Sequence, residues 1–257
     1  MIVFDRVSFS YGSRPVLQQV SFRVQTEERV AVLGGSGEGK TTVLRLILGL
    51  LRPDSGRIFI DAEDITDRKE SELRAVRRKF SIVFQDGALF DSLTVRENVA
   101  FCLREYTRMT EEEIDQKVKE LLKRVDLENA IDLMPEELSG GMHRRVAIAR
   151  SFAACEPEMF LYDEPTTGLD PVNADSICRL ILDLSHGGRG LIIVTHKVFD
   201  AMKVANRFMF LRNGNILFDG DQAALIRSPL LEIQAFLQEL SLSSPPPGAD
   251  QEQNRHV

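Results

Sequence analysis

A glycine-rich loop between an apolar strand and a helical segment constrains the fold of this chain more than any other feature. Residues 29–33 form a short apolar run, residues 34–41 read GGSGEGKT, and residues 42–50 have helical character. The octapeptide matches the pattern G-x-x-x-x-G-K-S/T, in the strand and helix context that this pattern requires. A glycine-rich turn without function is the alternative, and that context argues against it. The sequence therefore predicts a phosphate-binding loop within an α/β fold.

The residue types of this loop suit a bound nucleotide. Glycines let the backbone curl so that N–H groups point at the β- and γ-phosphates, and the helix N-terminus adds its positive dipole. Lys40 would neutralise phosphate charge and Thr41 would bind Mg²⁺. Glu38 puts a carboxylate near a polyanion, so we expect its side chain to point outward. The expected ATP-binding residues of the loop are Gly34, Gly35, Ser36, Gly37, Glu38, Gly39, Lys40, Thr41 and Thr42.

Two adjacent carboxylates follow an apolar strand further along the chain. Residues 159–162 read MFLY, and Asp163 and Glu164 come next, which resembles a Walker B element. Asp163 would hold Mg²⁺, and Glu164, on the other side of the pleat, would act as general base on the attacking water. A strand that ends in Asp-Glu is by itself more often a solvated turn. The phosphate-binding loop upstream reverses that preference.

The periodicity of the chain predicts three structural parts followed by a tail. Alternating residues at 2–9 and 16–24 indicate an N-terminal antiparallel β portion. Residues 86–157 are mainly helical, which indicates an inserted helical subdomain. Strands and helices then alternate, and this alternation predicts a parallel core sheet with strands at 159–162, 190–194, 207–211 and 215–219. Residues 241–257 are rich in Pro, Ser and charge, so we expect a disordered tail.

Composition limits the partners and the compartment. The net charge of −7 argues against nucleic acid, which needs a basic face. Cys102, Cys155 and Cys178 form an odd set without a C-x-x-C spacing, which fits a reducing compartment and argues against disulfides or zinc. The N-terminus lacks the features of a signal peptide, and no apolar stretch approaches the roughly 20 residues that cross a bilayer. We therefore expect a cytoplasmic chain that reaches a membrane only through a partner.

The segment Leu138–Met142, which reads LSGGM, separates this chain from other phosphate-loop proteins. It opens a helix, where a Ser hydroxyl, bare glycine amides and the helix dipole form an anion site. The segment resembles the signature of ABC ATPases. In that family it lies against the γ-phosphate that the opposite subunit holds, which implies a homodimer with ATP between Ser139, Gly140 and Gly141 of one copy and the loop of the other. Ser139 would also serve as an ordinary N-cap, but an N-cap does not need two glycines.

The other elements of the ABC family follow in the family's order. Tyr11 matches the aromatic residue that stacks on adenine, Gln85 the Q-loop, Asp170 the D-loop and His196 the H-loop. The resemblance implies that ATP and Mg²⁺ are bound, that Thr41, Gln85 and Asp163 hold the metal, and that Glu164 and His196 are catalytic. It covers residues 1–240 and implies one ABC ATPase domain with a Mg²⁺-dependent ATPase activity.

One departure from the family pattern indicates a narrower group. The common signature ends in Gln, whereas this one ends in Met142. Together with residues 87–99 and the helix that begins MHRRVAIAR, it resembles the ATPases of Mla and Mce lipid transport systems. That resemblance implies two ATPases, two integral-membrane permease subunits and an MCE-type lipid-binding protein, with this chain on the cytoplasmic face of the inner membrane. The complex would move phospholipid or other lipid between bacterial membranes.

Three alternative functions remain. An ABC importer for a small solute such as an amino acid would differ only in cargo, which other subunits select. A non-transport ABC ATPase is disfavoured, because the chain has no long coiled-coil insertion and no second ATPase half. A degenerate, non-enzymatic protein is disfavoured because Lys40, Glu164 and His196 are all present.

Apolar residues after the Q-loop suggest the route by which a permease is selected. In the family this region lines a groove that receives a coupling helix, and Ala88, Leu89, Phe90 and Leu93 would line it here. The alternative is that these side chains are ordinary core of the helical subdomain.

Overall fold

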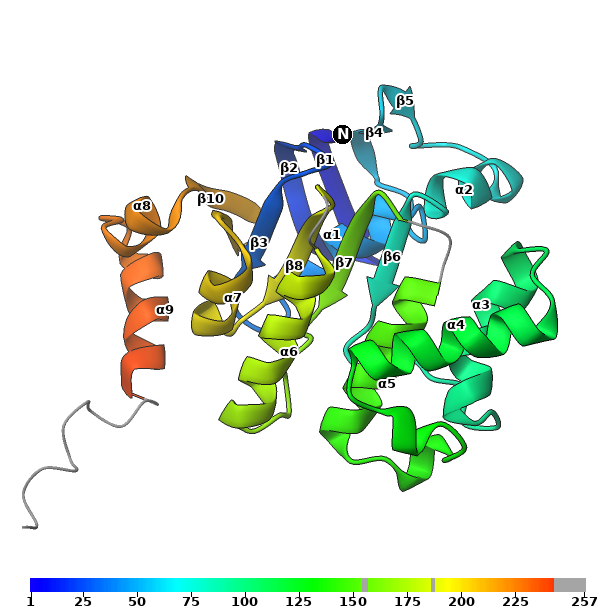
Figure 1. Ribbon diagram of the computed structural model, residues 1–257. Coiled ribbons are helices and arrows are strands. Elements are labelled where there is room, and N and C mark those ends of the chain that lie inside the picture. The colour runs from blue at the N-terminus through cyan, green and yellow to red at the C-terminus, as the bar shows by residue number, and fades with distance from the viewer. Residues whose placement is uncertain (154–156, 186–187, 243–257) are drawn as a thin grey trace, which may run out of the picture.

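Two sheets form the centre of the molecule. The computed structural model describes residues 1–153, 157–185 and 188–242, and it has the expected α/β architecture with N-terminal antiparallel strands (Figure 1). The first sheet is antiparallel and has the strand order β2-β1-β4-β5. Its strands are β1 (Ile2–Tyr11), β2 (Arg14–Val24), β4 (Ser55–Ile60) and β5 (Glu63–Asp64). Buried and exposed residues alternate along much of β1 and β2, as expected for a sheet with one covered face.

The second sheet carries the phosphate-binding loop. Its order is β10-β9-β3-β8-β7-β6, and β9, β3, β8, β7 and β6 run parallel. The bounds are β3 (Arg29–Leu33), β6 (Phe80–Val83), β7 (Met159–Asp163), β8 (Gly190–Thr195), β9 (Arg207–Arg212) and β10 (Asn215–Gly220). The prediction of a parallel strand at 215–219 is wrong, because β10 pairs antiparallel with β9. Asn213 and Gly214, both with positive φ, form a two-residue hairpin turn there, and Asn-Gly favours this turn.

Two apolar clusters cover the two faces of the second sheet. Along β3, Ala31 and Leu33 face one cluster, whereas Val30 and Val32 face the other. The first cluster joins the sheet to α3–α7, and the second joins it to α1, α2 and the antiparallel sheet. Strands covered on both faces are apolar throughout, which explains why β7 and β8 read as continuous apolar runs.

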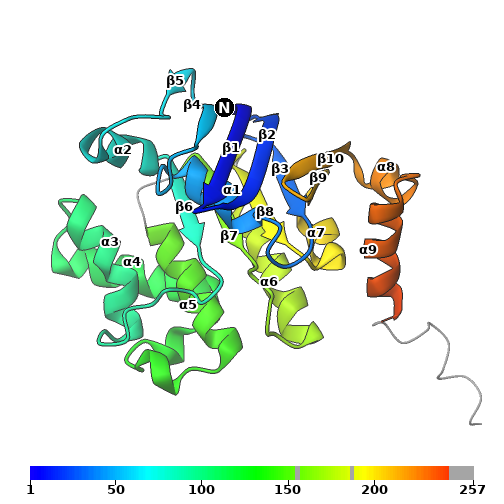
Figure 2. The ribbon, with the colours of Figure 1, turned by 180° about the vertical axis from the view of Figure 1, so that it is seen from behind.

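Helices lie on both faces of the second sheet, whereas one face of β1 and β2 has no helix over it in the part of the chain that the structure describes (Figures 1 and 2). Those outside the predicted helical subdomain are α1 (Lys40–Ile47), α2 (Glu70–Arg77), α6 (Pro171–Leu184), α7 (Val198–Val204), α8 (Gln222–Ile226) and α9 (Leu231–Leu242). The helix α9 extends two residues into the predicted tail, and residues 243–257 lie outside the described part of the chain, as does Cys155. Among the described residues, no helix is both long and apolar enough to span a membrane.

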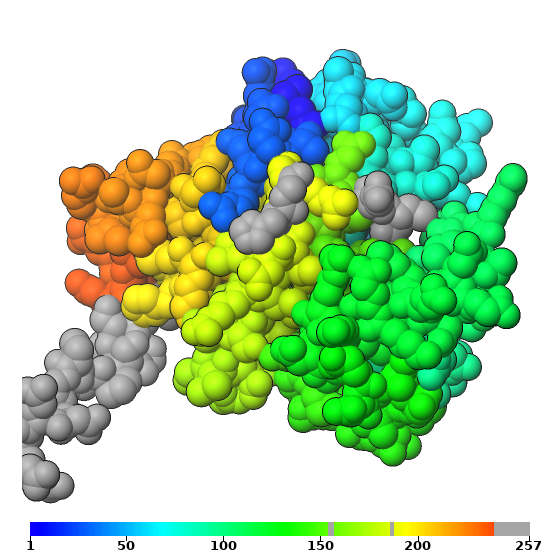
Figure 3. All heavy atoms as spheres, in the orientation of Figure 1, coloured from blue at the N-terminus to red at the C-terminus, as the bar shows by residue number. Residues whose placement is uncertain are grey.

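The remaining helices form a lobe beside the second sheet (Figure 1), and its surface is the green part of Figure 3. They are α3 (Val95–Tyr106), α4 (Glu111–Arg124) and α5 (Gly140–Ala153), with short 3-10 turns at Glu128–Ala130 and Pro135–Glu137. Thr110 caps α4 by accepting a hydrogen bond from Glu113 N–H, and Thr94 caps α3 in the same way. The bounds 86–157 for a separate helical subdomain stay a prediction.

Candidate functional site

The phosphate-binding loop lies between β3 and α1, where other strands press closely against it. A Cβ atom on Gly34 would collide with the Leu211 carbonyl oxygen of the neighbouring strand β9. Gly39 has a φ of 102° and would place a Cβ atom 2.8 Å from Val16 Cγ1. Both positions therefore need glycine for close approach, and Gly39 also for its left-handed backbone.

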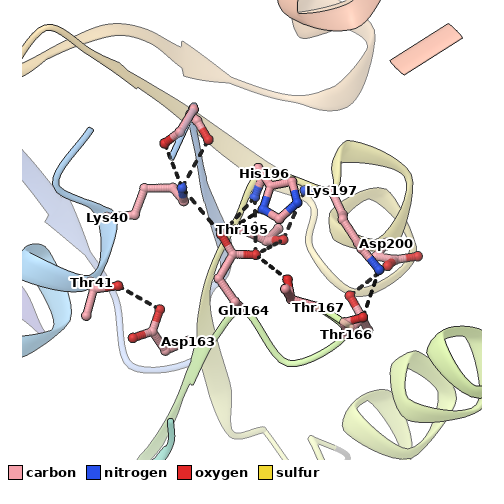
Figure 4. Close-up of polar contacts among 12 residues, drawn as sticks. Lys40, Thr41, Asp163, Glu164, Thr166, Thr167, Thr195, His196, Lys197 and Asp200 are labelled. Carbon is pink, nitrogen blue, oxygen red and sulfur yellow. Dashed lines mark hydrogen bonds and ion pairs between the residues drawn. The ribbon is translucent and has the colours of Figure 1, made fainter. Parts of the chain in front are cut away.

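Lys40 is buried and bends back over the loop. Its Nζ donates to the carbonyl oxygens of Gly34 at 3.1 Å and Gly35 at 2.9 Å, and it lies 3.3 Å from Glu164 Oε1 (Figure 4). The ammonium group is thus held at the loop by two neutral acceptors and one carboxylate. This arrangement places a positive charge beside a carboxylate at the carboxyl edge of the sheet.

The expectation that Glu38 points outward is wrong. Its Oε2 accepts a hydrogen bond from the Asn213 N–H at 2.7 Å, and its Oε1 lies 3.1 Å from Arg212 Nη1. The Glu38 carboxylate is therefore neutralised by the end of β9 and joins the loop to the β9–β10 turn. A phosphate site can accommodate this glutamate because Arg212 balances its charge.

Thr41 and Asp163 meet although they are far apart in the sequence. The Thr41 hydroxyl donates to Asp163 Oδ1 at 2.9 Å. Burial raises the pKa of Asp163 above its ordinary value, while the Thr41 hydrogen bond opposes the rise. These two oxygens fit Mg²⁺, which proteins commonly bind through one or two carboxylates together with substrate phosphates. Gln85 is exposed just after β6, and no described hydrogen bond links it to this pair.

Glu164 is the most heavily bonded side chain of the site. Its Oε1 lies 3.0 Å from His196 Nδ1 and accepts from the His196 backbone N–H at 3.2 Å. Burial acts to raise the pKa of Glu164, but the His196 hydrogen bond and the Lys40 charge outweigh it, so the pKa is lowered. Its backbone has a φ of 48°, a left-handed conformation that costs a non-glycine residue about 1–3 kcal/mol. The surrounding contacts must hold Glu164 in this conformation.

Two hydroxyl groups that the sequence analysis missed bind the other oxygen of Glu164. Thr195 donates to Oε2 at 2.8 Å and Thr167 donates to it at 3.0 Å (Figure 4). Thr195 ends β8 and Thr167 lies in the loop after β7, so the contact with Thr195 spans 31 residues. No local pattern in the sequence distinguishes these two threonines from solvated ones.

The signature segment lies at the start of α5. Ser139 acts as its N-cap, because its Oγ accepts a hydrogen bond from the Met142 N–H at 3.3 Å. The carboxylate of Asp170 caps α6 in the same way and also accepts from the Asn173 side chain at 2.6 Å. A Cβ atom on Gly141 would lie 3.1 Å from Asn173 Oδ1, so the two segments pack together within one chain. None of the described hydrogen bonds joins this signature region to Lys40 or Glu164.

Tyr11 ends β1 and is 46% exposed. Its ring contacts Phe9 edge to face at 4.8 Å, and Arg45 donates weakly to its hydroxyl at 3.5 Å. Among the described residues, no hydrogen bond joins Tyr11 to Lys40, Glu164 or His196.

A groove lies between α2, β6 and the helical lobe, and both apolar side chains and arginines line it; the arginines are Arg74, Arg77, Arg78 and Arg150. It has a volume of about 560 Å³, and Ala88, Phe90, Phe101 and Tyr106 are among the residues that line it. Leu89 does not belong to this lining, because it packs against the first apolar cluster. Of the four residues predicted to line a groove, Ala88 and Phe90 do so, Leu89 packs against the core, and the half-buried Leu93 belongs to neither set.

The fold is that of a known family. Residues 17–167 match the family model described as ABC transporter. The chain belongs to the ABC transporter family, and it is an ATP-binding subunit that hydrolyses ATP.

Several characterised proteins are similar over most of this chain. The intermembrane phospholipid transport system ATP-binding protein MlaF of Escherichia coli K12 is 38% identical over 236 residues, which cover 91% of this chain and 87% of that protein. The glutamine transport ATP-binding protein GlnQ of the same organism is 39% identical over 242 residues, covering 94% of this chain and all of that one. The dimeric, post-hydrolysis structure of the ATP-binding cassette MJ0796 with ADP and Pi superposes with a TM-score of 0.80. It is 33% identical and covers 86% of this chain and 98% of that one.

Proposed function

We propose that this chain energises the transport of phospholipid or another lipid as the ATPase subunit of an ABC transporter. The similarity to MlaF over 91% of the chain supports this cargo, as does Met142 in the signature. The working complex would contain two copies of this chain, integral-membrane permease subunits and an MCE-type lipid-binding protein. The chain would then lie on the cytoplasmic face of the inner membrane.

The proposal for catalysis is carried by one observation. Lys40, Glu164 and His196 converge at one point of the sheet edge, with the Thr41 and Asp163 pair beside them. Lys40 would bind the phosphates of ATP. Thr41 and Asp163, with Gln85 after the nucleotide has bound, would hold Mg²⁺, which supplies neutralisation of phosphate charge.

Glu164 would act as the general base and His196 would orient it. The Lys40 ammonium group now faces Glu164 and lowers its pKa. When phosphate takes Lys40 as its partner, this stabilisation of the carboxylate weakens and Glu164 becomes a better base for the attacking water. The arrangement therefore links proton abstraction to occupancy of the phosphate site.

Two copies of the chain would complete each site. Ser139, Gly140 and Gly141 lie at the N-terminus of a 14-residue helix, where amide groups and the helix dipole favour an anion. They would face the γ-phosphate held by the other copy, with Asp170 near the junction and Tyr11 against adenine. The dimer of the similar cassette MJ0796 supports this assembly.

Substitution of Glu164 tests the catalytic proposal. Glu164→Gln should retain ATP binding and lose turnover by a factor on the order of 10², because the amide cannot accept the proton. Lys40→Ala should instead weaken ATP binding itself. Phosphate release and nucleotide binding by purified protein measure the two effects. Hydrolysis by Glu164→Gln at the parental rate would show that the base is another group.

Dimer formation tests the role of the signature. Glu164→Gln protein should shift from monomer to dimer on addition of MgATP, because trapped ATP binds both copies. A second change, Ser139→Arg, should abolish that shift by filling the anion site with a large side chain. Size-exclusion chromatography with light scattering measures the mass. A dimer that persists with Ser139→Arg would exclude the proposed contact.

The second candidate function is that of an amino-acid importer ATPase, favoured by the 39% identity to GlnQ. The composition of the complex purified from membranes decides between the two. Bound phospholipid and an MCE-domain protein would support lipid transport. A periplasmic amino-acid-binding protein in their place would rule it out.

A further inference from the structure

Two hydrogen bonds join Thr166 to the first turn of α7, and together with the α7 backbone between Lys197 and Asp200 they form a ring close to Glu164 in the sequence. The Thr166 hydroxyl donates to Asp200 Oδ2 at 2.7 Å, and the Thr166 carbonyl accepts from Lys197 Nζ at 2.7 Å (Figure 4). Lys197 and Asp200 stand at the beginning of α7, directly after His196. The ring therefore joins the peptide after Glu164 to the helix after His196.

The two side chains that form the Thr166–Asp200 hydrogen bond are buried. Thr166 is 0% exposed and Asp200 is buried, so both polar groups depend on each other for hydrogen bonding. The Asp200 charge has Lys203 as a further partner, with Nζ 3.7 Å from Oδ1. Neither Thr166 nor Asp200 contacts the phosphate-binding loop through any hydrogen bond among the described residues. Their burial is thus not explained by the nucleotide site itself.

The ring lies next in the chain to Glu164, whose backbone is strained. Glu164 adopts a left-handed backbone, and such a conformation persists only where its surroundings fix it. The Glu164 N–H is fixed by the Val194 carbonyl at 2.9 Å. On its other side, the chain is fixed two residues later, at Thr166. The same anchor places Thr167, whose hydroxyl binds Glu164 Oε2.

We propose that Thr166 and Asp200 are positioning residues for catalysis, which hold Glu164 and His196 in register through this ring. This inference rests on the proposed role of Glu164 as base. Asp200 fixes the Thr166 side chain, Lys197 fixes the Thr166 carbonyl, and the segment between them aims the carboxylate. Without the ring, ATP would still bind at Lys40 and Thr41, but Glu164 would be misplaced for the attacking water.

Variants at Thr166 separate the hydroxyl from the packing. Thr166→Val keeps the shape and loses the donor, whereas Thr166→Ser keeps the donor. Because small misplacements of a catalytic group cost up to about 10²-fold, we expect Thr166→Val to lower kcat at least ~10-fold, with KM for ATP within about 3-fold. Thr166→Ser should restore most of kcat. Equal losses in both variants, or a parental kcat in Thr166→Val, would overturn the inference.

Two further variants keep the test valid if Thr166→Val fails to fold. Asp200→Asn weakens the hydrogen bond to the Thr166 hydroxyl, and Lys197→Met removes the one to the Thr166 carbonyl. Lys197 is half-buried, and both variants should lower kcat with little change in KM. Asp175→Asn is the matched control, because Asp175 pairs with the same Lys203 at 2.9 Å but lies outside the ring. It should keep the parental kcat. Parental rates in both Asp200→Asn and Lys197→Met would also overturn the inference.

A double-mutant cycle with Glu164→Gln shows whether the ring acts through Glu164. If it does, adding Thr166→Val to Glu164→Gln should reduce kcat no further, because the group that the ring positions is already absent. Losses that multiply would place Thr166 in an independent role and overturn the inference. A parental rate in Glu164→Gln alone would instead refute the assignment of the base, so the two failures are distinguishable.

Discussion

Tyr162 is a single residue whose surroundings predict a measurable effect on stability. It is fully buried in β7, and its hydroxyl has no hydrogen-bond partner among the described residues. An unsatisfied buried hydroxyl costs about 1–3 kcal/mol. We therefore expect Tyr162→Phe to raise the free energy of unfolding by about 1 kcal/mol, and Tm by roughly 2–4 °C.

Thermal and denaturant unfolding of purified protein measure this change, with Phe160→Leu as a control for altered packing in the same strand. Phe160 lies in the same cluster, its ring 6.2 Å from that of Tyr162. The control should destabilise, because it removes apolar contacts. A loss of stability in Tyr162→Phe would contradict the interpretation of its hydroxyl as unsatisfied.

Some residues of the site could be predicted from the sequence and others could not. Lys40, Asp163 and Glu164 stand in motifs whose spacing reflects local geometry, so they were predicted and lie together. Thr195 and Asp200 act through contacts that span 31 and 34 residues, and no periodicity reports such contacts. Glu38 was misjudged for a related reason, since its partner Arg212 comes from a strand far along the chain.

At the scale of elements, α5 holds the segment that follows β6. Arg144 Nη1 donates to the Phe84 carbonyl at 2.9 Å, and the Arg150 guanidinium donates to the Gly87 carbonyl at 2.9 Å and to the next carbonyl at 2.7 Å. His143 fills the space beside Gly87, where a Cβ atom would lie 2.9 Å from the imidazole. The helix that opens with the signature thus fixes the backbone on both sides of the predicted Q-loop.

The contact of His143 predicts a dependence of stability on pH. Burial lowers the pKa of His143 from its ordinary value, and the nearby Arg144 charge adds to the effect. The unfolded chain therefore binds a proton at His143 more readily than the native protein does. The contribution of neutral His143 to the free energy of unfolding is therefore complete above the unfolded pKa of about 6.5. It is lost as the pH falls below that value.

Comparison with His143→Gln isolates this contribution. The difference in unfolding free energy between the parental protein and the variant should shift against the parental protein from about pH 7 downward. Denaturant unfolding at several pH values measures it. A difference that stays constant between pH 7.5 and pH 5 would show that the pKa of His143 is the same in both states.

Elements were predicted well where one period dominates. The apolar runs at 29–33 and 190–194 form β3 and β8, and the mainly helical region 86–157 contains α3, α4 and α5. The direction of β10 was missed because a strand pattern does not report which way a strand runs. The Asn213-Gly214 pair between the two strands indicates a tight hairpin, and a hairpin makes β10 antiparallel to β9.

For the molecule as a whole, the groove beside β6 predicts how the ATPase meets its permease. Phe90 is 41% exposed in the groove, whereas Leu89 packs into the core. Phe90→Asp should therefore weaken association with permease subunits at least ~10-fold and spare the basal ATPase activity, because it removes the exposed ring from the contact and adds a carboxylate that loses its water there. Leu89→Asp should destabilise the fold itself.

Co-purification from membranes, together with basal ATPase assays and thermal unfolding, separates these two effects. Arg150 lies over the Phe90 ring at 5.7 Å, so Phe90→Leu serves as a control that keeps an apolar side chain at this position without the aromatic contact. It should retain most of the association. Unchanged co-purification of Phe90→Asp would locate the permease contact elsewhere.

The order of strands in the second sheet has a consequence for synthesis on the ribosome. The strand that carries the phosphate-binding loop, β3, pairs with residues 191–195 on one side and with residues 207–210 on the other. Its residues emerge early, yet both of its neighbours are translated much later. Contacts between such distant segments form slowly, and the unpaired strand remains a site for aggregation in the meantime. Nascent chains that stop before β8 should consequently lack a nucleotide pocket, although they already contain the whole loop and signature.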